Sequence, residues 1–378
     1  MNIFIKILVF ILIFSILLST SSLLIFATEA GINNISAKSA CLIEAESGKV
    51  LYSNNSTTKM PMASTTKVMT AIVALESNIS LDADIQIPQG AVGIEGSSAY
   101  LRYNEKVKFE VLLYALLLAS ANDAAVALAY ATAGSIDKFV ELMNLKAQTL
   151  GLLNTNFTNP HGLYDVNHYT TAEDLAKIMA YAIRNPNFSK ITSCQKFSFL
   201  RDDGTSFLFV NHNRLLKTYD GVIGGKTGFT KKSGRCLVSW ANRDGLNLIA
   251  VTLNAPDDWN DHAKLYDFGF SNYERVYFES INVKTPVISG NKSEVLLSSN
   301  AFSIVLPKSC ATIKIQINTP RFLFAQIKKN EKIGNIHYYK NGKLIATSPL
   351  YSQEDVELIN YKFNLFEWII EILKGIFI

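Results

Sequence analysis

The chain has 378 residues, of which 48% are hydrophobic and 18% are charged, and its formal net charge is +4. This length accommodates two domains, at least one of them with a sizeable core. The weak positive charge, without a cluster of lysines and arginines to follow a phosphate backbone, argues against nucleic acid as a partner.

The first 30 residues, "MNIFIKILVFILIFSILLSTSSLLIFATEA", contain one early lysine and no further charge before Glu29. Small residues at Ala27, Thr28 and Ala30 suit a signal peptidase, so residues 1–30 are predicted to be a secretory signal peptide. The apolar run is also long enough for an uncleaved membrane anchor. Both interpretations place the rest of the chain outside the cytoplasm.

The cysteines and histidines are spaced without any metal-binding pattern. Cys41, Cys194, Cys236 and Cys310 are far apart, and the five histidines form no H-E-x-x-H motif. These spacings predict no metal site. Two disulfides are possible in an oxidising compartment, but Cys236 falls within an apolar strand pattern, so free buried thiols are expected.

Strand patterns lie at both ends of residues 31–272, and helical patterns lie between them. Residues 39–55 indicate a hairpin, and residues 234–254 indicate another one around Arg243-Asp244-Gly245. The helical patterns are a helix that begins near Ser64 and the segments 109–133, 135–151 and 170–185, after which strand patterns take over. We expect an α/β (α+β) domain with an antiparallel sheet assembled from both ends and helices packed on it.

The segment 109–133 is almost wholly apolar, which raises the alternative of a membrane span. Ser120, Asn122 and Asp123 lie at its centre, where burial in lipid would be costly. Two core helices joined by a polar turn are therefore the favoured interpretation.

Residues 273–352 have a different texture, with alternating strand patterns and turn residues but no helical period. This composition predicts a small all-β, sandwich-like domain. It has no cluster of acids, histidines or cysteines, so we expect a spacer or packing module rather than a second active site.

The stretch "MASTTKVMTA" at 62–71 places Ser64 three residues before Lys67, so that the two would be neighbours on one side of a helix. A serine here could simply cap the helix. Alternatively, Ser64 is a nucleophile whose proton is removed by Lys67, provided that the amine is neutral. Burial and a nearby second cation would both lower the pKa of Lys67.

Two further motifs favour the catalytic alternative. "SAN" at Ser120-Ala121-Asn122 falls in the polar break of 109–133, and "KTG" at Lys226-Thr227-Gly228 comes just before the second hairpin. Lys226 could be the second cation, Ser120 could relay a proton to the leaving amine, and Asn122 could orient a substrate peptide bond. Helix capping and a strand twist at Gly228 are the structural alternatives.

Ser-x-x-Lys, Ser-x-Asn and Lys-Thr-Gly in this order are typical of penicillin-binding proteins and class A β-lactamases. Four other segments add to the likeness: "GSSAYL" at 96–101, "NPHGLYDVNHYTTAEDLAKIMA" at 159–180, "NRLL" at 213–216 and "KTGFTKKSGRCLVS" at 226–239. The chain resembles the serine-type D-alanyl-D-alanine carboxypeptidases, the low-molecular-mass penicillin-binding proteins that trim cell-wall peptides. The likeness is strong over residues 35–270, and the β-rich segment and tail match the family's usual second domain and anchor.

The resemblance implies a penicillin-binding/β-lactamase-like fold and removal of the terminal D-alanine from peptidoglycan stem peptides, without a metal or organic cofactor. It makes Ser64 the acylated serine, Lys67 its proton acceptor and Ser120 the third catalytic group. β-Lactams would then be covalent inhibitors.

The resemblance also implies the substrate contacts. Lys226 and Thr227 would bind the terminal carboxylate, and the backbone N–H groups of Ser64 and Phe229 would form the oxyanion hole. The chain departs from the family at Ala121, often glycine, and at Phe229, polar in some members. Neither change removes a required group.

His161, in "NPHGL", is a possible general base, but a structural histidine in a turn is the favoured interpretation because Lys67 already supplies the base. His168 and His262 belong to no catalytic motif.

Two other functions remain open. A β-lactamase of class A uses a glutamate and a water for deacylation, but no E-x-x-L-N stretch is present, and "AEDLAKI" has the glutamate without the asparagine. Slow release of bound penicillin is therefore expected. A non-catalytic wall-binding or β-lactam-sensing module is disfavoured because the catalytic set is intact.

Residues 353–378 are predicted to hold the enzyme on the outer face of the cytoplasmic membrane. In "YKFNLFEWIIEILKGIFI", the polar residues Asn364, Glu367, Glu371 and Lys374 share one helical face, and apolar residues fill most of the rest. This pattern is typical of a helix lying in the membrane interface. A helix packed on the β-rich domain or at a subunit contact is the alternative.

Overall fold

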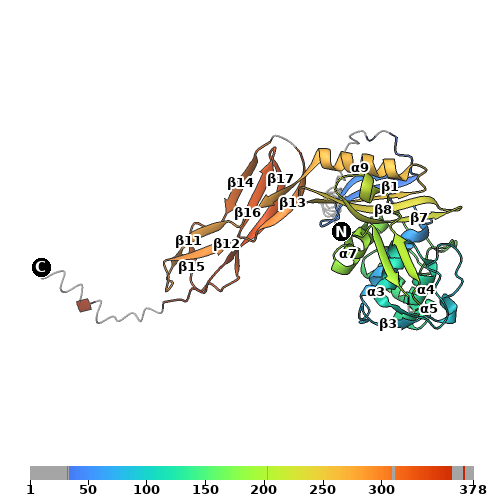
Figure 1. Ribbon diagram of the computed structural model, residues 1–378. Coiled ribbons are helices and arrows are strands. Elements are labelled where there is room, and N and C mark those ends of the chain that lie inside the picture. Colours follow the sequence, from blue (N-terminus) through green and yellow to red (C-terminus); the bar gives the residue numbers. More distant parts are fainter. Residues whose placement is uncertain (1–31, 33, 202, 309–310, 360–368, 371–378) are drawn as a thin grey trace, which may run out of the picture.

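The computed structural model describes residues 32, 34–201, 203–308, 311–359 and 369–370. The predicted signal peptide, Cys310 and residues 360–368 and 371–378 of the predicted tail helix lie outside these residues. The first part of that predicted helix, residues 353–359, is instead non-helical chain, in which Val356 and Leu358 are bridged to Ile327 and Gly290 of the sandwich. Figure 1 shows an α/β domain, from which an elongated all-β domain extends to one side.

A five-stranded antiparallel sheet of order β2-β1-β9-β8-β7 forms the centre of the first domain. Its strands are β1 (Ser39–Glu44), β2 (Val50–Asn54), β7 (Val222–Thr230), β8 (Gly234–Arg243) and β9 (Leu246–Leu253). The β1–β9 pair, with Leu42 opposite Ala250, joins the two ends of the domain. The predicted sheet and both predicted hairpins are confirmed.

Helices cover both faces of this sheet (Figure 1). They are α2 (Lys67–Leu75), α3 (Phe109–Leu117), α4 (Asn122–Ala133), α5 (Ile136–Thr149), α6 (Ala172–Ala182), α7 (Pro186–Ser193), α8 (Leu215–Thr218) and α9 (Asp258–Asn272). Helix α9 packs on one face, where Leu42 meets Leu265 and Tyr266 in one buried cluster. On the other face, Cys41 and Ile43 join the larger core under α2, α4 and α6, as the period-2 alternation of a strand requires.

Short elements complete this domain. They are the 3₁₀ turns η1 (Ala63–Thr66) and η2 (Gln89–Ala91), the hairpin of β3 (Asp84–Gln86) with β4 (Lys106–Lys108), and the hairpin of β5 (Lys196–Leu200) with β6 (Ser206–Val210). The 109–133 segment is two helices, as predicted. Within the described part of the chain, no helix is both long and apolar enough to cross a membrane.

Helices α7 and α9 were not predicted, because strand patterns were expected to take over after residue 185. The Asn185 side chain caps α7 by accepting hydrogen bonds from the N–H groups of Asn187 and Phe188, with Pro186 in the first turn. That Asn-Pro pair is itself a helix-start signal. In α9 the buried residues recur three and four apart among many polar ones, so the helical period was present but diluted.

The second domain is an all-β sandwich, as predicted. Its strands are β10 (Tyr273–Phe278), β11 (Asn282–Ile288), β12 (Glu294–Ser298), β13 (Phe302–Pro307), β14 (Ile313–Asn318), β15 (Leu323–Phe324), β16 (Lys332–Lys340) and β17 (Lys343–Ser352). A six-stranded sheet of order β14-β16-β17-β12-β11-β15 accompanies the β10–β13 pair. Phe278, Tyr338 and Leu297 pack in the core between them.

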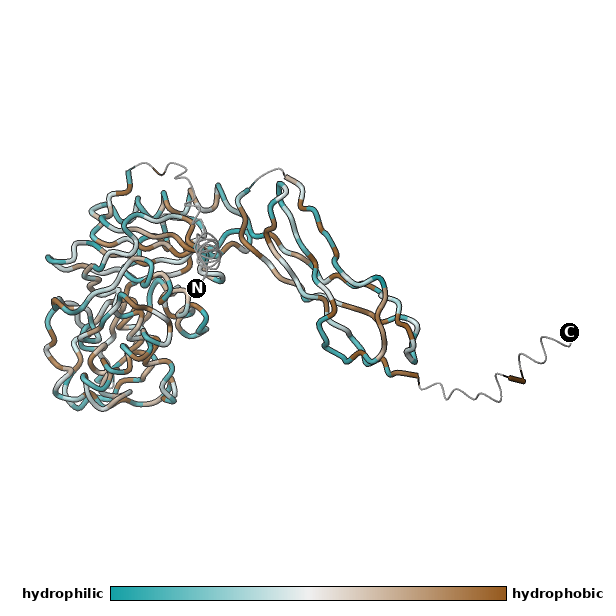
Figure 2. The backbone as a smooth tube through the Cα atoms, turned by 180° about the vertical axis from the view of Figure 1, so that it is seen from behind, coloured by the Kyte–Doolittle hydropathy of each residue, from teal (hydrophilic) through white to brown (hydrophobic). Residues whose placement is uncertain are grey.

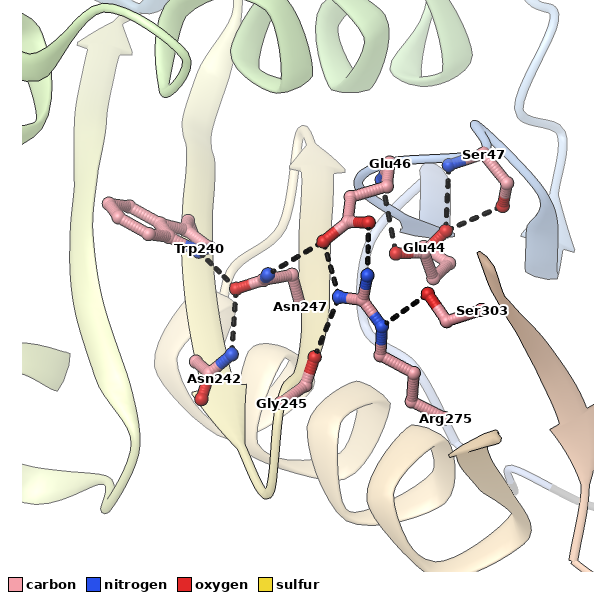
Figure 3. A network of polar contacts seen from close by, with 9 residues as sticks. All are labelled: Glu44, Glu46, Ser47, Trp240, Asn242, Gly245, Asn247, Arg275 and Ser303. Carbon is pink, nitrogen blue, oxygen red and sulfur yellow. Dashed lines mark hydrogen bonds and ion pairs between the residues drawn. The ribbon is translucent and has the colours of Figure 1, made fainter. Parts of the chain in front are cut away.

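Arg275 of β10 joins the two domains (Figure 3). Its guanidinium forms a two-pronged ion pair with Glu46 in the β1–β2 turn and donates to the Gly245 carbonyl 3.2 Å away and to Ser303 Oγ 2.9 Å away. Asn247 Nδ2 donates weakly, at 3.5 Å, to the same Glu46 carboxylate. The junction is therefore built from two turns of the α/β sheet and two strands of the sandwich.

A cavity of about 940 Å³ adjoins this junction, lined by residues of β13, the β16–β17 turn and the β1–β2 turn. Neither Ser64 nor Lys67 contributes to its wall.

Candidate active site

Ser64 lies in the 3₁₀ turn η1, immediately before α2, so the helix proper begins at Lys67 rather than near Ser64. The turn is held by hydroxyls: Thr65 Oγ1 donates to the Met62 carbonyl (2.6 Å), and Thr66 Oγ1 donates to the Ala63 carbonyl (2.8 Å). Neither η1 nor α2 has a side-chain N-cap hydrogen bond. The capping alternative for Ser64 is therefore not realised.

Lys67 is fully buried at the first position of α2. Its Nζ lies 3.0 Å from Ser64 Oγ, 2.7 Å from Asn122 Oδ1 and 2.6 Å from the His161 carbonyl oxygen. Burial lowers the pKa of Lys67 well below its usual value and the ammonium of Lys226 lowers it further, against an opposing effect of Asp123. A lysine in this setting can hold a neutral amine next to a hydroxyl.

Ser120 and Lys226 form a second hydroxyl–amine pair. Lys226 Nζ donates to Ser120 Oγ (3.0 Å) and to the Thr227 carbonyl (2.8 Å), and burial lowers the pKa of Lys226 to about 7. Ser120 has φ = 59° in the break between α3 and α4, and α4 begins without a side-chain cap. A non-glycine residue held in the left-handed region is typical of functional sites.

Strand β7 lies directly against the turn that carries Ser64. A Cβ atom on Gly228 would stand 2.9 Å from the Ser64 nitrogen and 3.0 Å from the Thr65 nitrogen, so only glycine fits here. Because β7 is the last strand of the sheet, one side of its backbone has no strand partner within that sheet. A substrate backbone can add along this edge.

The loop 159–162 packs against the turn η1, which carries Ser64. A Cβ on Gly162, which has φ = +91°, would stand 2.0 Å from the Ala63 carbonyl oxygen, so this loop also packs too closely for a side chain. The ring of His161 accepts a hydrogen bond from the Leu163 N–H at 3.2 Å, and burial lowers its pKa to about 3. Its carbonyl, rather than its ring, reaches Lys67.

His168 braces the same turn. Its Nδ1 accepts from the Thr158 N–H at 3.0 Å, which leaves Nε2 to donate to Thr66 Oγ1 at 2.7 Å. Thr66 in turn donates to the Ala63 carbonyl. Burial lowers the pKa of His168 to about 4, so the neutral ring persists at neutral pH.

Asn122 and Asp123 fix the loop 95–101 on the other side of the site. Asn122 Nδ2 donates to the Glu95 carbonyl at 2.5 Å while its Oδ1 faces Lys67. The Asp123 carboxylate accepts from the N–H groups of Ala99 and Leu101 at 3.0 and 3.1 Å. Both ends of the Asn122 amide are thus engaged within the protein, so a substrate contact there would have to share or displace one of them.

A cleft of about 330 Å³ opens over these groups. Its walls are formed by Ser64, Ser97, Ser120, His212, Thr227, Gly228, Phe229, Arg235, Asp258 and Trp259. Four of the residues predicted from the motifs line it, while Lys67, Asn122 and Lys226 are buried alongside. In the described part of the chain, no group of three metal-ligating side chains is present.

The sequence reasoning missed Arg235, Asp258 and Trp259. Arg235 stands opposite Phe229 in the β7–β8 ladder, and its Nε and one terminal nitrogen donate to a single Asp258 oxygen at 3.0 and 2.7 Å. Its guanidinium also lies 5.4 Å from the centre of the Trp259 ring. The β7–β8 hairpin register would have placed Arg235 at the cleft, but α9, which brings the other two, was not predicted.

Comparison with known proteins matches this site to a family. The profile of the D-alanyl-D-alanine carboxypeptidase family, Peptidase_S11, matches residues 26–257, and the profile of the penicillin-binding protein 5 C-terminal domain matches residues 275–358. The chain belongs to the D-alanyl-D-alanine carboxypeptidase family. The resemblance inferred from the motifs is confirmed.

Several carboxypeptidases are similar over most of their length. D-alanyl-D-alanine carboxypeptidase DacF of Bacillus subtilis is 34% identical over 85% of this chain and 86% of the relative. DacC of Escherichia coli is also 34% identical, over 88% of each. The crystal structure of penicillin-binding protein 5 from Haemophilus influenzae superposes with a TM-score of 0.74 at 32% identity, over 86% of this chain and 98% of that one.

Members of this carboxypeptidase family are serine hydrolases that work through an acyl-enzyme. The two buried thiols of the described residues, Cys41 and Cys236, are not reactive groups of that kind. Cys41, Cys194 and Cys236 are free, as predicted, and burial raises the pKa of Cys41 to about 12 and that of Cys236 to about 11. Both buried thiols therefore stay protonated at neutral pH.

Proposed function

We propose that this chain is a D-alanyl-D-alanine carboxypeptidase that removes the terminal D-alanine from peptidoglycan stem peptides through an acyl-enzyme on Ser64. One observation carries the proposal: the buried Nζ of Lys67 has Ser64 Oγ at 3.0 Å and two fixed acceptors on its other sides.

A neutral amine has two N–H donors and one lone pair. The Asn122 and His161 oxygens use the two donors of Lys67, so its lone pair is directed at the hydroxyl of Ser64. The lowered pKa of Lys67 supplies the neutral form. Lys67 therefore takes the proton as Ser64 Oγ bonds to the carbonyl carbon of the penultimate D-alanine.

Ser120 links this step to departure of the leaving group. The scissile C–N bond breaks when the nitrogen of the terminal D-alanine receives a proton. Ser120, held by Lys226, relays to it the proton that Lys67 took from Ser64, which returns Lys67 to the neutral amine. Water then attacks the acyl-enzyme, releases the shortened peptide and returns the proton to Ser64. Each step uses groups of this chain and water.

The substrate is held along β7. Lys226 and Thr227 bind its terminal carboxylate, and Arg235 adds a guanidinium in the same cleft. The N–H groups of Ser64 and Phe229 stabilise the oxyanion, for which the close approach of Gly228 to Ser64 is the supporting geometry. Asn122 positions the substrate amide. β-Lactams carry a strained amide and a carboxylate in a related arrangement, so they acylate Ser64.

The proposed setting is the outer face of the cytoplasmic membrane. Residues 1–30 act as the export signal, and the amphipathic segment within 353–378 lies in the membrane interface. Fractionation of cells that express a chain ending at Glu357 tests the anchor. Release of active enzyme into the soluble fraction supports it, and continued sedimentation with membranes contradicts it.

Release of D-alanine from a soluble pentapeptide ending in D-Ala-D-Ala tests the activity. We expect release by the natural chain and by Ser80→Ala, an exposed serine, but none by Ser64→Ala. Intact mass after exposure to penicillin should show one covalent adduct, absent from Ser64→Ala. Release of D-alanine by Ser64→Ala would overturn the assignment, and rapid turnover of a chromogenic cephalosporin would favour a β-lactamase.

A further inference from the structure

The far end of the second domain carries an exposed apolar patch that the reaction does not use. It consists of five side chains from three segments: Ile288, Phe322, Phe324, Leu358 and Ile359, called the tip patch below. Phe324 is 67% and Phe322 47% exposed, and their rings meet edge to face with centroids 5.5 Å apart. Exposed aromatic and aliphatic groups gathered in this way mark interaction sites.

Backbone pairing shows that the tip patch is one surface. Ile288 at the end of β11 stands beside Phe324 in the parallel β11–β15 pair, so the two share a face. The Ile359 N–H donates to the Ser289 carbonyl at 2.9 Å, and Leu358 is bridged to Gly290. The neighbours Val287 and Leu323 point into the sandwich core instead. The tip patch therefore gathers at the β15 edge of the sheet, with Ile288 and Phe324 on the outward face and Leu358 and Ile359 paired beside them.

Cations border the tip patch. Arg321 directly precedes Phe322, and Lys328 and Lys329 lie in the next turn, all three exposed and none in an ion pair within the described residues. The nearby acids Glu331 and Asp355 accept hydrogen bonds from the N–H groups of the same turn.

The acids near the tip patch equal the cations in number, because Glu331, Asp355 and Glu357 are as many as Arg321, Lys328 and Lys329. Glu354 is paired with Lys292, and Glu357 precedes Leu358. Glu331 and Asp355 are held back on the turn by its N–H groups, whereas the long side chains of the three cations are free to extend. Beside exposed aromatics, such cations can reach the headgroups of an anionic bilayer while the rings enter the interface.

The position at which the tail leaves the sandwich supports a lipid bilayer as the partner. The last residue before the tail, Ile359, is part of the tip patch, and residues 360–378 follow it with the amphipathic composition of an interfacial segment. Figure 1 shows this end of the sandwich farthest from the α/β domain, and Figure 2 shows hydrophobic residues where the chain leaves it. A tail that enters a membrane next to the tip patch would bring that patch to the same surface.

We propose that the tip patch, with Arg321, Lys328 and Lys329, rests in the headgroup region of an anionic lipid bilayer as a second membrane contact beside the tail. The sandwich then stands with its far end on the membrane. The contact fixes the orientation of the domain, which attachment through the tail alone does not do. The proposal rests on the proposed extracytoplasmic setting, but the test below needs neither catalysis nor export.

Fluorescence of a tryptophan placed in the tip patch measures contact with lipid directly. The chain from residue 31 to its end, with Trp368→Phe to remove the tail's own tryptophan, carries Phe324→Trp. The spectrum of the same chain without Phe324→Trp is subtracted, because Trp240 and Trp259 also emit. The matched control carries Leu153→Trp, a side chain 86% exposed on the α/β domain. With phosphatidylglycerol vesicles we expect the indole introduced at position 324 to shift its emission to the blue and to lose about half of it when the acyl chains are brominated, with no change in the control.

A second comparison measures the strength of the contact. Phe322→Ser with Phe324→Ser should weaken cosedimentation with phosphatidylglycerol vesicles by about tenfold. Ile315→Ser with Ile317→Ser is the matched control, because these isoleucines are 48% and 45% exposed at the opposite edge of the same sheet. Its binding should be unchanged, and D-alanine release from soluble peptide should be the same in both.

Other outcomes identify another occupant. Vesicle-bound Phe324→Trp protein that is quenched no more than the Leu153→Trp control overturns the proposal, as does failure to bind vesicles. A dimer in light scattering that Phe322→Ser with Phe324→Ser dissolves assigns the β15 edge to a second copy. Greater access of iodide to the indole of the Phe324→Trp protein after removal of residues 360–378 assigns the tip patch to the chain's own tail. Intact carboxypeptidase activity in any of these cases separates failure of this proposal from failure of the proposed function.

Discussion

The two domains differ in whether they bury charged side chains. In its described residues the α/β domain buries eight Asp, Glu, Lys and Arg side chains: Glu44, Lys67, Asp123, Asp174, Arg201, Lys226, Asp258 and Asp261. In the described part of the sandwich domain, the buried polar residues are serines and threonines. Burial of a charge is costly unless it is paired or hydrogen-bonded. The α/β domain bears this cost mainly around its site. Five of the eight buried side chains line the cleft, lie beside it or hold the loops around it.

This difference indicates that the first domain carries out the chemistry and that the second domain determines where the enzyme is held. Lys67 is buried where desolvation and the Lys226 ammonium lower its pKa, which is what an amine needs to accept a proton at neutral pH. The sandwich holds a largely apolar core and, in its described residues, buries no Asp, Glu, Lys or Arg side chain. Substitutions in the first domain should therefore change turnover, and those in the second should change where the enzyme works.

Replacement of the buried base should have the largest effect. Lys67→Met keeps the volume of the side chain but removes the lone pair, so kcat/KM should fall on the order of a thousandfold. Lys138→Met, at an exposed lysine of α5, should leave it unchanged. Circular dichroism checks that both variants fold. A Lys67→Met enzyme with more than about a tenth of the natural rate would show that another group takes the proton.

Gly228→Ala, which adds a single methyl group, should have the next largest effect on the rate of acylation. Its Cβ would stand 2.9 Å from the Ser64 nitrogen, so β7 must move away from the nucleophile. Displacement of about 1 Å lowers rates by roughly a hundredfold, and we expect that loss in the rate of acylation by penicillin. Phe229→Ala is the control, because that exposed side chain can go while its backbone N–H remains. An unchanged rate in Gly228→Ala contradicts the close packing of β7 on η1.

Arg235 should act through the substrate's charge. Arg235→Gln removes one charge-assisted contact to the terminal carboxylate, so KM should rise by about tenfold to a hundredfold with little change in kcat. A substrate with an amidated C-terminus should not distinguish the variant from the natural enzyme. Arg243→Gln, at the far end of the same strand, should bind both substrates normally. Equal losses on both substrates would make Arg235 a structural residue.

The pH profile should be bell-shaped, because the two lysines must carry opposite charge states. In the proposed mechanism Lys67 works as the neutral amine, so kcat/KM should fall by about tenfold per pH unit below its pKa. In the same mechanism Lys226 binds the carboxylate as the ammonium, whose pKa is lowered to about 7, so binding should weaken as pH rises past that value. Lys226→Gln should have a lower plateau without the alkaline limb. An alkaline limb that persists in this variant assigns it to another group.

The sequence alone predicted the parts of the fold that have strong local signals. The hairpin turns and the polar break at Ser120 each have a short-range cause, and each lies where it was expected. The motif residues could also be brought to one site, because their order and element types matched a known arrangement.

The rest depends on contacts between distant segments. Nothing local to Ser64 shows that Ala63 is held at φ = 47° by packing against Gly162, so a helix start was expected where a 3₁₀ turn occurs. Trp259 and Asp258 reach the cleft only because α9 follows β9 across the sheet. Signals for α7 and α9 were present in the sequence but weaker than the strand propensity around them.

A substitution at the junction between the domains should have the smallest effect on activity. It tests most directly whether the second domain influences turnover. Arg275→Ala removes the ion pair to Glu46, so the sandwich should move more freely, and small-angle scattering should show a broader distribution of shapes. On a soluble peptide kcat/KM should change less than about twofold, since an ion pair this exposed is weak and distant from the lysines. Arg321→Ala, at the tip, should change neither measurement.

A contrary result is possible because the junction also touches the catalytic sheet. Glu46 accepts a hydrogen bond from Asn247, whose Oδ1 accepts from Trp240 Nε1 at 3.2 Å, and Trp240 stands opposite Gly224 on β7 (Figure 3). Arg275→Ala could lower activity on the soluble peptide as much as on peptidoglycan at the membrane. In that case this chain of contacts couples the sandwich to β7, the edge strand proposed to bind substrate. The second domain would then set the geometry of the active site as well as its position.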